Sequence, residues 1–154
     1  MTSSRVAEQF AGDRFAGVPS EATVGEVMHP GVIFCSPESP VRQAARLMAR
    51  YNVHAVVVLG DDEEGGLWGI VSDSDLVSVV ARRALDEHTA GGMARTPLVT
   101  VCRGDSVARA AELMTEHRVT HLLVLVGRRP VGMVSTLDLA CAVAEGLDSA
   151  VSDG

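Results

Sequence analysis

The spacing of apolar residues in the first half of the chain predicts alternating helices and strands. Positions 41–48 carry apolar residues at i, i+3, i+4 and i+7, which predicts a helix with one buried face. A second apolar helix face is predicted after residue 72, and it consists of Leu76, Val79, Val80 and Ala84. β-branched, mostly apolar runs predict strands at 32–35, 53–59 and 67–72.

The same order of elements returns later in the chain, so the sequence contains an internal repeat. The apolar helix positions of 41–48 recur at 107–114 with a constant offset of 66 residues. Ser39 in the first copy and Asp105 in the second are the predicted N-caps of these two helices. The predicted strands of the second copy are 98–101, 119–126 and 131–135.

Each copy has the order β-α-β-β-α, which predicts an α/β (α+β) fold. A unit of about sixty residues would be only marginally stable alone, because small domains bury little surface, so the two copies are expected to share a core. The segment before the first copy contains Phe10 and Phe15, and either a short packed helix or a frayed tail fits it. The predicted divisions are an N-terminal extension at 1–22, repeat one at 23–87, repeat two at 88–147 and a C-terminal tail at 148–154.

Composition narrows the function classes. A net charge of −7 argues against broad nucleic-acid binding, which requires a basic surface. Apolar runs such as 122–126 are far too short to span a membrane, and no secretory signal pattern opens the chain. The three cysteines are an odd number without metal-type spacing, and we expect them to be reduced and buried in a cytoplasmic protein. They are Cys35, Cys102 and Cys141.

One short pattern closes both copies: a glycine opens an apolar strand, a serine ends it, and an aspartate follows three residues later. The serine and aspartate are Ser72 and Asp75 in repeat one, and Ser135 and Asp138 in repeat two. Ser-x-x-Asp before an apolar run is a capping box, a purely structural device. The same junction can also serve a ligand, since a helix N-terminus favours phosphate and an aspartate can accept from ribose hydroxyls. Both interpretations remain open, and they can coexist.

The order of these motifs, found twice at matching spacing, resembles the cystathionine-β-synthase (CBS) domain as a tandem pair, often called a Bateman module. The resemblance covers about residues 23–146. It implies two β-α-β-β-α repeats packed sheet to sheet in pseudo-two-fold symmetry, with two clefts between them. Such clefts commonly bind AMP, ADP, ATP, S-adenosylmethionine or sometimes NAD, and such modules usually sense and regulate.

Carried over residue by residue, the resemblance implies two sets of ligand-binding residues. The first set is Ile70, Ser72 and Asp75, faced by Thr96, Pro97, Val119, Thr120 and His121. The second set is Met133, Ser135 and Asp138, faced by Pro30, Gly31, Val53, His54 and Ala55. The candidate cations for phosphate are Arg103, Arg118, His121, Arg128 and Arg129.

The sequence therefore predicts a cytoplasmic regulatory module, not an enzyme, that binds an adenosine nucleotide or S-adenosylmethionine and signals to an unidentified partner protein. No cofactor is required, and neither nucleic acid nor membrane insertion is expected. A homodimer is predicted through exposed apolar helix faces that include Val79, Val80, Ala142 and Val143. One alternative is a dimerisation or docking module that holds no ligand. A metal or redox sensor that uses His117, His121 or cysteine is a further alternative.

Overall fold

The computed structural model describes residues 22–60 and 66–146. The chain divides into two compact units. The middle unit is residues 31–99, and the outer unit combines the chain up to residue 30 with the chain from residue 100 onward. Residues 1–21 of the predicted extension, and the whole predicted tail, lie outside the described residues.

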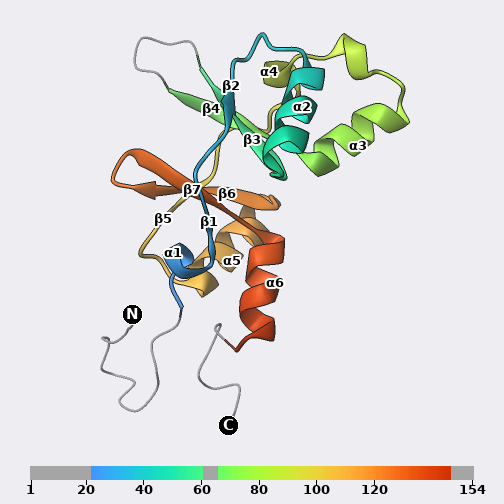
Figure 1. Cartoon of the computed structure of the whole chain (residues 1–154). Coiled ribbons are helices and arrows are strands. Elements are labelled where there is room, and N and C mark those ends of the chain that lie inside the picture. Colours follow the sequence, from blue (N-terminus) through green and yellow to red (C-terminus); the bar gives the residue numbers. More distant parts are fainter. Residues whose placement is uncertain (1–21, 61–65, 147–154) are drawn as a thin grey trace, which may run out of the picture. The chain divides into compact units, whose positions relative to one another are not determined.

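The middle unit contains a sheet of order β2-β3-β4, with helices packed on it (Figure 1). Strands β2 and β3 are parallel, and β3 and β4 are antiparallel. The core joins Val41, Ala44 and Met48 of α2 to Val56 and Val58 of β3. The elements are β2 (Phe34–Cys35), α2 (Val41–Tyr51), β3 (Ala55–Leu59), β4 (Leu67–Ser72), α3 (Asp73–Ala81), the 3-10 helix η2 (Leu85–Glu87) and α4 (Ala90–Met93).

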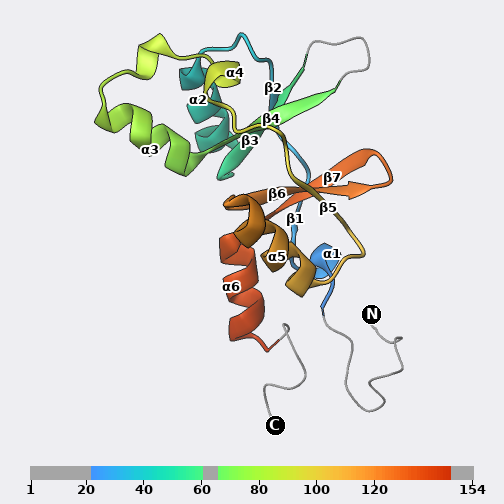
Figure 2. The ribbon, with the colours of Figure 1, turned by 180° about the vertical axis from the view of Figure 1, so that it is seen from behind.

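The outer unit contains a sheet of order β1-β7-β6-β5, with helices gathered on one face of it (Figure 2). Val107, Ala110 and Met114 of α5 are buried, as the repeat predicts from the equivalent positions of α2. Leu122, Leu123 and Val124 form the buried centre of β6. The elements are α1 (Val24–Val27), β1 (His29–Pro30), β5 (Thr100–Cys102), α5 (Val107–His117), β6 (His121–Val126), β7 (Arg129–Ser135) and α6 (Thr136–Ala144).

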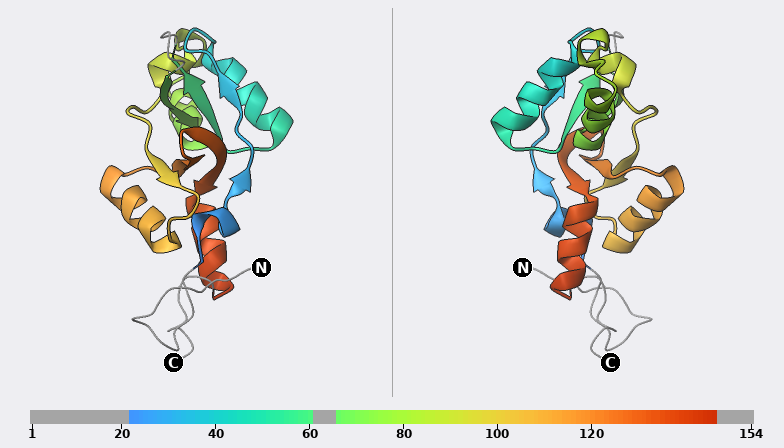
Figure 3. Two further views of the ribbon diagram at one scale, coloured as in Figure 1. Left: turned by 90° about the vertical axis from the view of Figure 1, so that its left-hand side faces the viewer. Right: turned by 90° about the vertical axis from the view of Figure 1, so that its right-hand side faces the viewer.

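The two units exchange their leading segments. Leading segment one, residues 22–30, belongs to the first repeat by sequence but folds in the outer unit, where β1 pairs with β7 (Figure 3). Leading segment two, residues 88–97, belongs to the second repeat but folds in the middle unit, where Arg95 bridges to Ile70 of β4. Each sheet therefore carries the leading segment of the other repeat.

Glycine is required where each leading segment crosses a strand. A Cβ added to Gly69 would lie 2.4 Å from the carbonyl oxygen of Arg95, and one added to Gly132 would lie 2.4 Å from that of His29. Ordinary contact begins at about 3.4 Å. The sequence pattern predicts these glycines at the start of their strands, but both lie inside β4 and β7, where they admit the backbone of the leading segments.

The predicted α/β class and the β-α-β-β-α order are confirmed, but the predicted N-caps are wrong by one residue. Pro40 and Ser106 occupy the N-cap positions of α2 and α5. Asp105 instead accepts a hydrogen bond from the Cys102 N–H at 3.0 Å, which closes the preceding turn. This leaves Ser106 to accept from the Arg109 N–H at 3.0 Å.

Two of the three cysteines were wrongly predicted to be buried. Cys102 and Cys141 are exposed, and Cys35 is intermediate. Cys102 is the last residue of β5, and its side chain falls on the exposed side of the strand after buried Val101. All three are free thiols.

Candidate functional site

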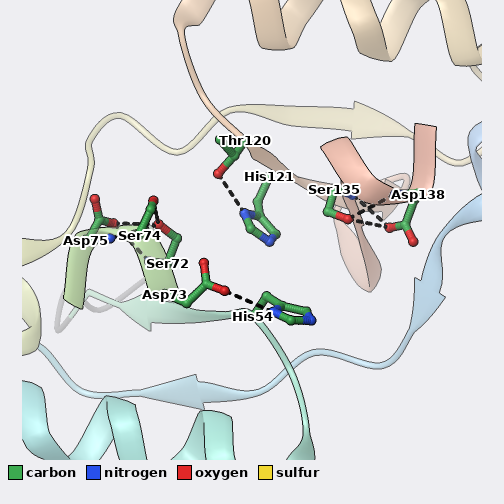
Figure 4. Close-up of polar contacts among 9 residues, drawn as sticks. All are labelled: His54, Ser72, Asp73, Ser74, Asp75, Thr120, His121, Ser135 and Asp138. Carbon is green, nitrogen blue, oxygen red and sulfur yellow. Dashed lines mark hydrogen bonds and ion pairs between the residues drawn. The ribbon is translucent and has the colours of Figure 1, made fainter. Parts of the chain in front are cut away.

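In the middle unit, the serine and aspartate of the closing motif form a capping box where β4 ends and α3 begins (Figure 4). Ser72 has an extended backbone, and its Oγ accepts from the Asp75 N–H at 3.4 Å. In return, Asp75 Oδ2 accepts from the Ser72 N–H at 2.9 Å and from Ser72 Oγ at 3.0 Å. The structural interpretation of Ser-x-x-Asp is therefore confirmed for this copy.

The outer unit repeats the arrangement between β7 and α6 (Figure 4). Asp138 Oδ2 accepts from the Ser135 N–H at 2.8 Å and from Ser135 Oγ at 3.1 Å. The Asp138 N–H donates to Ser135 Oγ at 3.2 Å. We call these two arrangements the Asp75 junction (Ser72, Asp75) and the Asp138 junction (Ser135, Asp138).

Each junction aspartate also contacts a basic side chain from the leading segment of its unit. Arg95 Nε lies 3.0 Å from Asp75 Oδ1, and His29 Nδ1 lies 2.9 Å from Asp138 Oδ1. Both carboxylates are only 7% exposed, whereas Arg95 is 56% and His29 75% exposed. The sequence reasoning missed both cations, because each meets its aspartate only through contacts between segments that are distant in the sequence. The available signal was that positions 29 and 95 are related by the repeat offset of 66.

The N-termini of α3 and α6 are less available to phosphate than the sequence suggested. The Asp73 N–H donates to the His54 carbonyl at 2.9 Å, and the Thr136 N–H donates to the Thr120 carbonyl at 3.0 Å. In each helix the hydroxyl of the capping serine accepts a hydrogen bond from one more first-turn N–H, that of Asp75 or Asp138. Because the junction aspartates already place negative charge in the first turn, these ends attract an anion less than bare helix ends do.

The middle unit brings several predicted ligand residues to the Asp75 junction. Ile70 is buried on β4 and bridges to Arg95, and Thr96 and Pro97 follow Arg95 as exposed residues. His54, whose carbonyl caps α3, also bonds through Nδ1 to Asp73 Oδ2 at 3.0 Å (Figure 4). The remaining predicted residues of this unit are exposed Gly31, half-buried Val53 and buried Ala55.

The outer unit holds the remaining members of the two predicted sets. Met133 of β7 is paired with His29 of β1, and Pro30 is the exposed second residue of that strand. Val119 and Thr120 precede β6, and Thr120 Oγ1 lies 2.9 Å from His121 Nδ1 (Figure 4). The first set therefore contributes three residues to this unit and five to the middle unit, and the second set is divided between the units as well.

A hollow of about 170 Å³ beside the Asp138 junction is lined by α1 and α6. Three of its lining residues are acidic: Glu26, Asp138 and Glu145. Cavities that enclose small organic ligands usually exceed about 300 Å³. The hollow is thus too small for a nucleotide, and its carboxylates would repel phosphate.

The redox-sensor and metal-sensor alternatives gain little support from the structure. Burial raises the pKa of the Cys35 thiol, which is opposite to what a reactive thiolate needs. Among residues 22–60 and 66–146, no group of three or more His, Cys, Asp or Glu side chains is arranged to hold a metal ion. No helix in the described part of the chain is long and apolar enough to cross a bilayer.

The sequence and the fold of the chain are similar to those of known proteins. A family model described as CBS domain matches residues 24–82 and 90–145. The chain is 32% identical over 115 residues to CBS domain-containing protein CBSX3, mitochondrial, of Arabidopsis thaliana, a match covering 72% of this chain and 56% of that protein. It is 30% identical over 120 residues to hypoxic response protein 1 of Mycobacterium tuberculosis, covering 77% of this chain and 82% of that one.

Solved structures show the same fold. The crystal structure of CBS domain protein PAE2072 from Pyrobaculum aerophilum complexed with AMP matches with a TM-score of 0.68 and 27% sequence identity. That match covers 82% of this chain and 98% of the other. The two segments matched by the family model correspond to the two repeats that the sequence pattern indicates.

Proposed function

The chain belongs to the CBS-domain family, and from this premise we propose that it is a regulatory module that binds an adenosine nucleotide and signals to a partner protein. The observation that carries the proposal is the pair of junctions, each with a nearly buried aspartate beside an exposed cation. A structural cap alone does not require the second carboxylate oxygen, which the cation contacts. The module does no chemistry of its own in this proposal, and its free thiols suit the cytoplasm.

AMP is the first ligand to test, because the similar protein PAE2072 was crystallised with it. In the proposal, Asp75 and Asp138 each accept hydrogen bonds from a ribose, a geometry that dinucleotide-binding acids also use. Ser72 and Ser135 hold the carboxylates in place through their N–H and hydroxyl groups. The other residues of the two predicted sets remain predicted contacts.

A thermal-denaturation screen against AMP, ADP, ATP, S-adenosylmethionine and NAD tests the proposal. A ligand that binds only the folded state stabilises it by about 2.7 kcal/mol at a hundred times its dissociation constant. For a domain of this size that corresponds to a rise in Tm of about 5–10 °C. If none of the five compounds raises Tm at millimolar concentration, the nucleotide proposal is wrong.

A matched set of variants assigns the binding to the junctions. Asp75→Asn and Asp138→Asn remove the charge and one of the two acceptor oxygens but keep an acceptor for the cap. We expect at least one of them to lose most of the ligand-induced rise in Tm. Asp86→Asn is the control, since Asp86 is exposed and pairs with Arg42 at the surface. If both junction variants keep the full ligand-induced rise in Tm, neither Asp75 nor Asp138 binds ribose.

The chain also offers a surface for the predicted homodimer, although two of the predicted contact residues are wrong. Val79 and Ala142 are buried within their own units. Val80 and Val143 are 58% and 57% exposed, and Val77 and Leu137 lie exposed on the same two helices, α3 and α6. Val77 and Val80 are three residues apart and share one face of α3, and Leu137 and Val143 are exposed on α6. We propose that the exposed apolar side chains of each helix contribute to the dimer contact.

Sedimentation of a charged variant tests the dimer. Val80→Asp combined with Val143→Asp should convert a dimer to a monomer at micromolar concentration, because an unpaired charge in an apolar contact is costly. Val126→Asp is the control, as it places the same charge at an exposed position of β6. A wild-type protein that sediments as a monomer at all concentrations tested would exclude this contact.

A further inference from the structure

The junction aspartates have too few free acceptor sites for the ribose contact as they stand. An ionised carboxylate offers about four lone-pair sites. At Asp75, Oδ2 accepts twice from Ser72, and Oδ1 faces Arg95 Nε. A ribose donates from two hydroxyls, but about one site remains, and the side chain is 7% exposed. One existing partner must leave before both hydroxyls can bond.

Arg95 is the partner that can leave at the lowest cost. Breaking the Ser72 contacts would remove the cap of α3, whereas the guanidinium of Arg95 is more than half exposed and can be hydrated again. The carboxylate of this ion pair is buried, but in the exchange a ribose hydroxyl replaces the guanidinium as its donor, so Asp75 is not left without a partner. The same reasoning applies to His29, whose ring is three-quarters exposed beside Asp138. In each unit the backbone contacts of the leading segment do not depend on this side chain.

We infer that Arg95 and His29 are intramolecular competitors of the ligand, each occupying the carboxylate oxygen that the ribose takes. This inference rests on the proposed function, because it assigns a role to residues at the same ribose-binding junctions. Binding then proceeds by exchange: the cation leaves Oδ1, and the ribose hydroxyl replaces it. The cation thereby sets the affinity of its junction.

The two competitors are chemically different, so the two junctions differ in affinity. Arg95 is always charged, and its guanidinium stays a strong donor to Asp75. His29 is charged only when protonated and contacts Asp138 through a single ring nitrogen. The competition is therefore weaker at Asp138, and the Asp138 junction is the tighter ribose site of the two.

Calorimetric titration of the full chain with adenosine and with AMP tests the inference. Adenosine has the ribose but no phosphate, so it separates competition from a direct contact between the cation and phosphate. Arg95→Met and His29→Ala should each bind both compounds about two- to fivefold more tightly. Arg46→Met and His117→Ala are the matched controls, since both residues are exposed on helices, and neither should alter affinity. Circular dichroism establishes that each variant is folded.

The possible results separate the explanations. Tighter binding of both compounds by the variants supports competition. A second supporting result would be wild-type affinity for adenosine that increases with salt concentration, together with loss of this salt dependence in the Arg95→Met and His29→Ala double variant. Weaker AMP binding with unchanged adenosine binding would mean that the cations hold phosphate, and the inference is overturned. Unchanged affinity for both compounds in both variants also overturns it. If neither compound binds wild type or any variant, the proposed function itself fails, and the inference fails with it.

Discussion

Replacing Gly132 or Gly69 by alanine should destabilise the protein, although alanine normally stabilises an extended segment. The new methyl carbon would lie 2.4 Å from a carbonyl oxygen of the leading segment, about 1 Å inside ordinary contact. For Gly132 the second neighbour is Met28 Sδ at 2.9 Å, and for Gly69 it is Thr96 Cγ2 at 2.8 Å. The side chains can move aside, but the backbone oxygen moves only if the whole leading segment does.

The size of the effect follows from what holds the leading segment. β1 is paired with β7 at only two positions, His29 with Met133 and Pro30 with Gly132. Overpacking of this kind typically costs about 1–3 kcal/mol. Gly→Ala also lowers the conformational entropy of the unfolded chain, which stabilises the folded state by about 0.4–1 kcal/mol. The net loss should be about 1–2 kcal/mol, or a fall in Tm of about 2–8 °C.

Gly104→Ala is the control with the opposite expected sign. A Cβ at Gly104 meets nothing within 4 Å, and its φ lies outside the left-handed region. The substitution should therefore leave stability unchanged or raise it slightly. Urea denaturation measures the free energy of unfolding of Gly69→Ala, Gly132→Ala and Gly104→Ala. Hydrogen exchange should increase in residues 24–30 for Gly132→Ala, and in 90–97 for Gly69→Ala. If both strand variants are as stable as Gly104→Ala, the close approach of the leading segments is wrong.

Three further predictions concern single side chains. Asp75→Asn should lower the free energy of unfolding by about 1 kcal/mol even without nucleotide, since the amide cannot accept from Arg95 while capping α3; urea denaturation measures it. Ser106→Ala should cost about 1 kcal/mol in the same assay, because Ser106 and not its neighbour caps α5. In iodoacetamide labelling near pH 8, Cys35 should react more slowly than Cys102 and Cys141, because its raised pKa leaves less thiolate. The difference should narrow as pH rises toward that pKa, and equal rates at pH 8 would contradict the burial of Cys35.

Local periodicity predicted the helices well because their faces depend on neighbours a few residues away. It placed the second strand of each repeat too early. Val53 and Val119 are apolar, but their N–H groups bond back to the Met48 and Met114 carbonyls at 3.0 Å and belong to helix ends. The turns depend on residues in the left-handed conformation, Asn52 (φ 54°) and Arg118 (φ 55°). Asparagine is a recognisable signal for such a position, whereas arginine is not.

The exchange of leading segments could not be predicted from local pattern. Pro30 and Gly31 suggest only that a helical turn ends. Strand β1 exists because residues about a hundred positions later offer it an edge, and pairing between distant segments has no periodic signature. The cations at 29 and 95 were missed for the same reason, since each meets its aspartate only through that pairing. Gly69 and Gly132 were the one indication, because glycine inside a strand often marks a close backbone approach.

The residues that the two repeats share give little evidence for ligand binding in this chain, because the fold alone would require them. Gly69 and Gly132 admit a backbone, Ser72 and Ser135 cap helices, and folding alone would require all four. The junction aspartates likewise complete the capping boxes through Oδ2. Only Oδ1 and the side chain that faces it are free of that structural task, and there the repeats differ, with arginine in one and histidine in the other. Substitutions at 29 and 95 therefore separate recognition from folding more cleanly than any substitution within the shared motif.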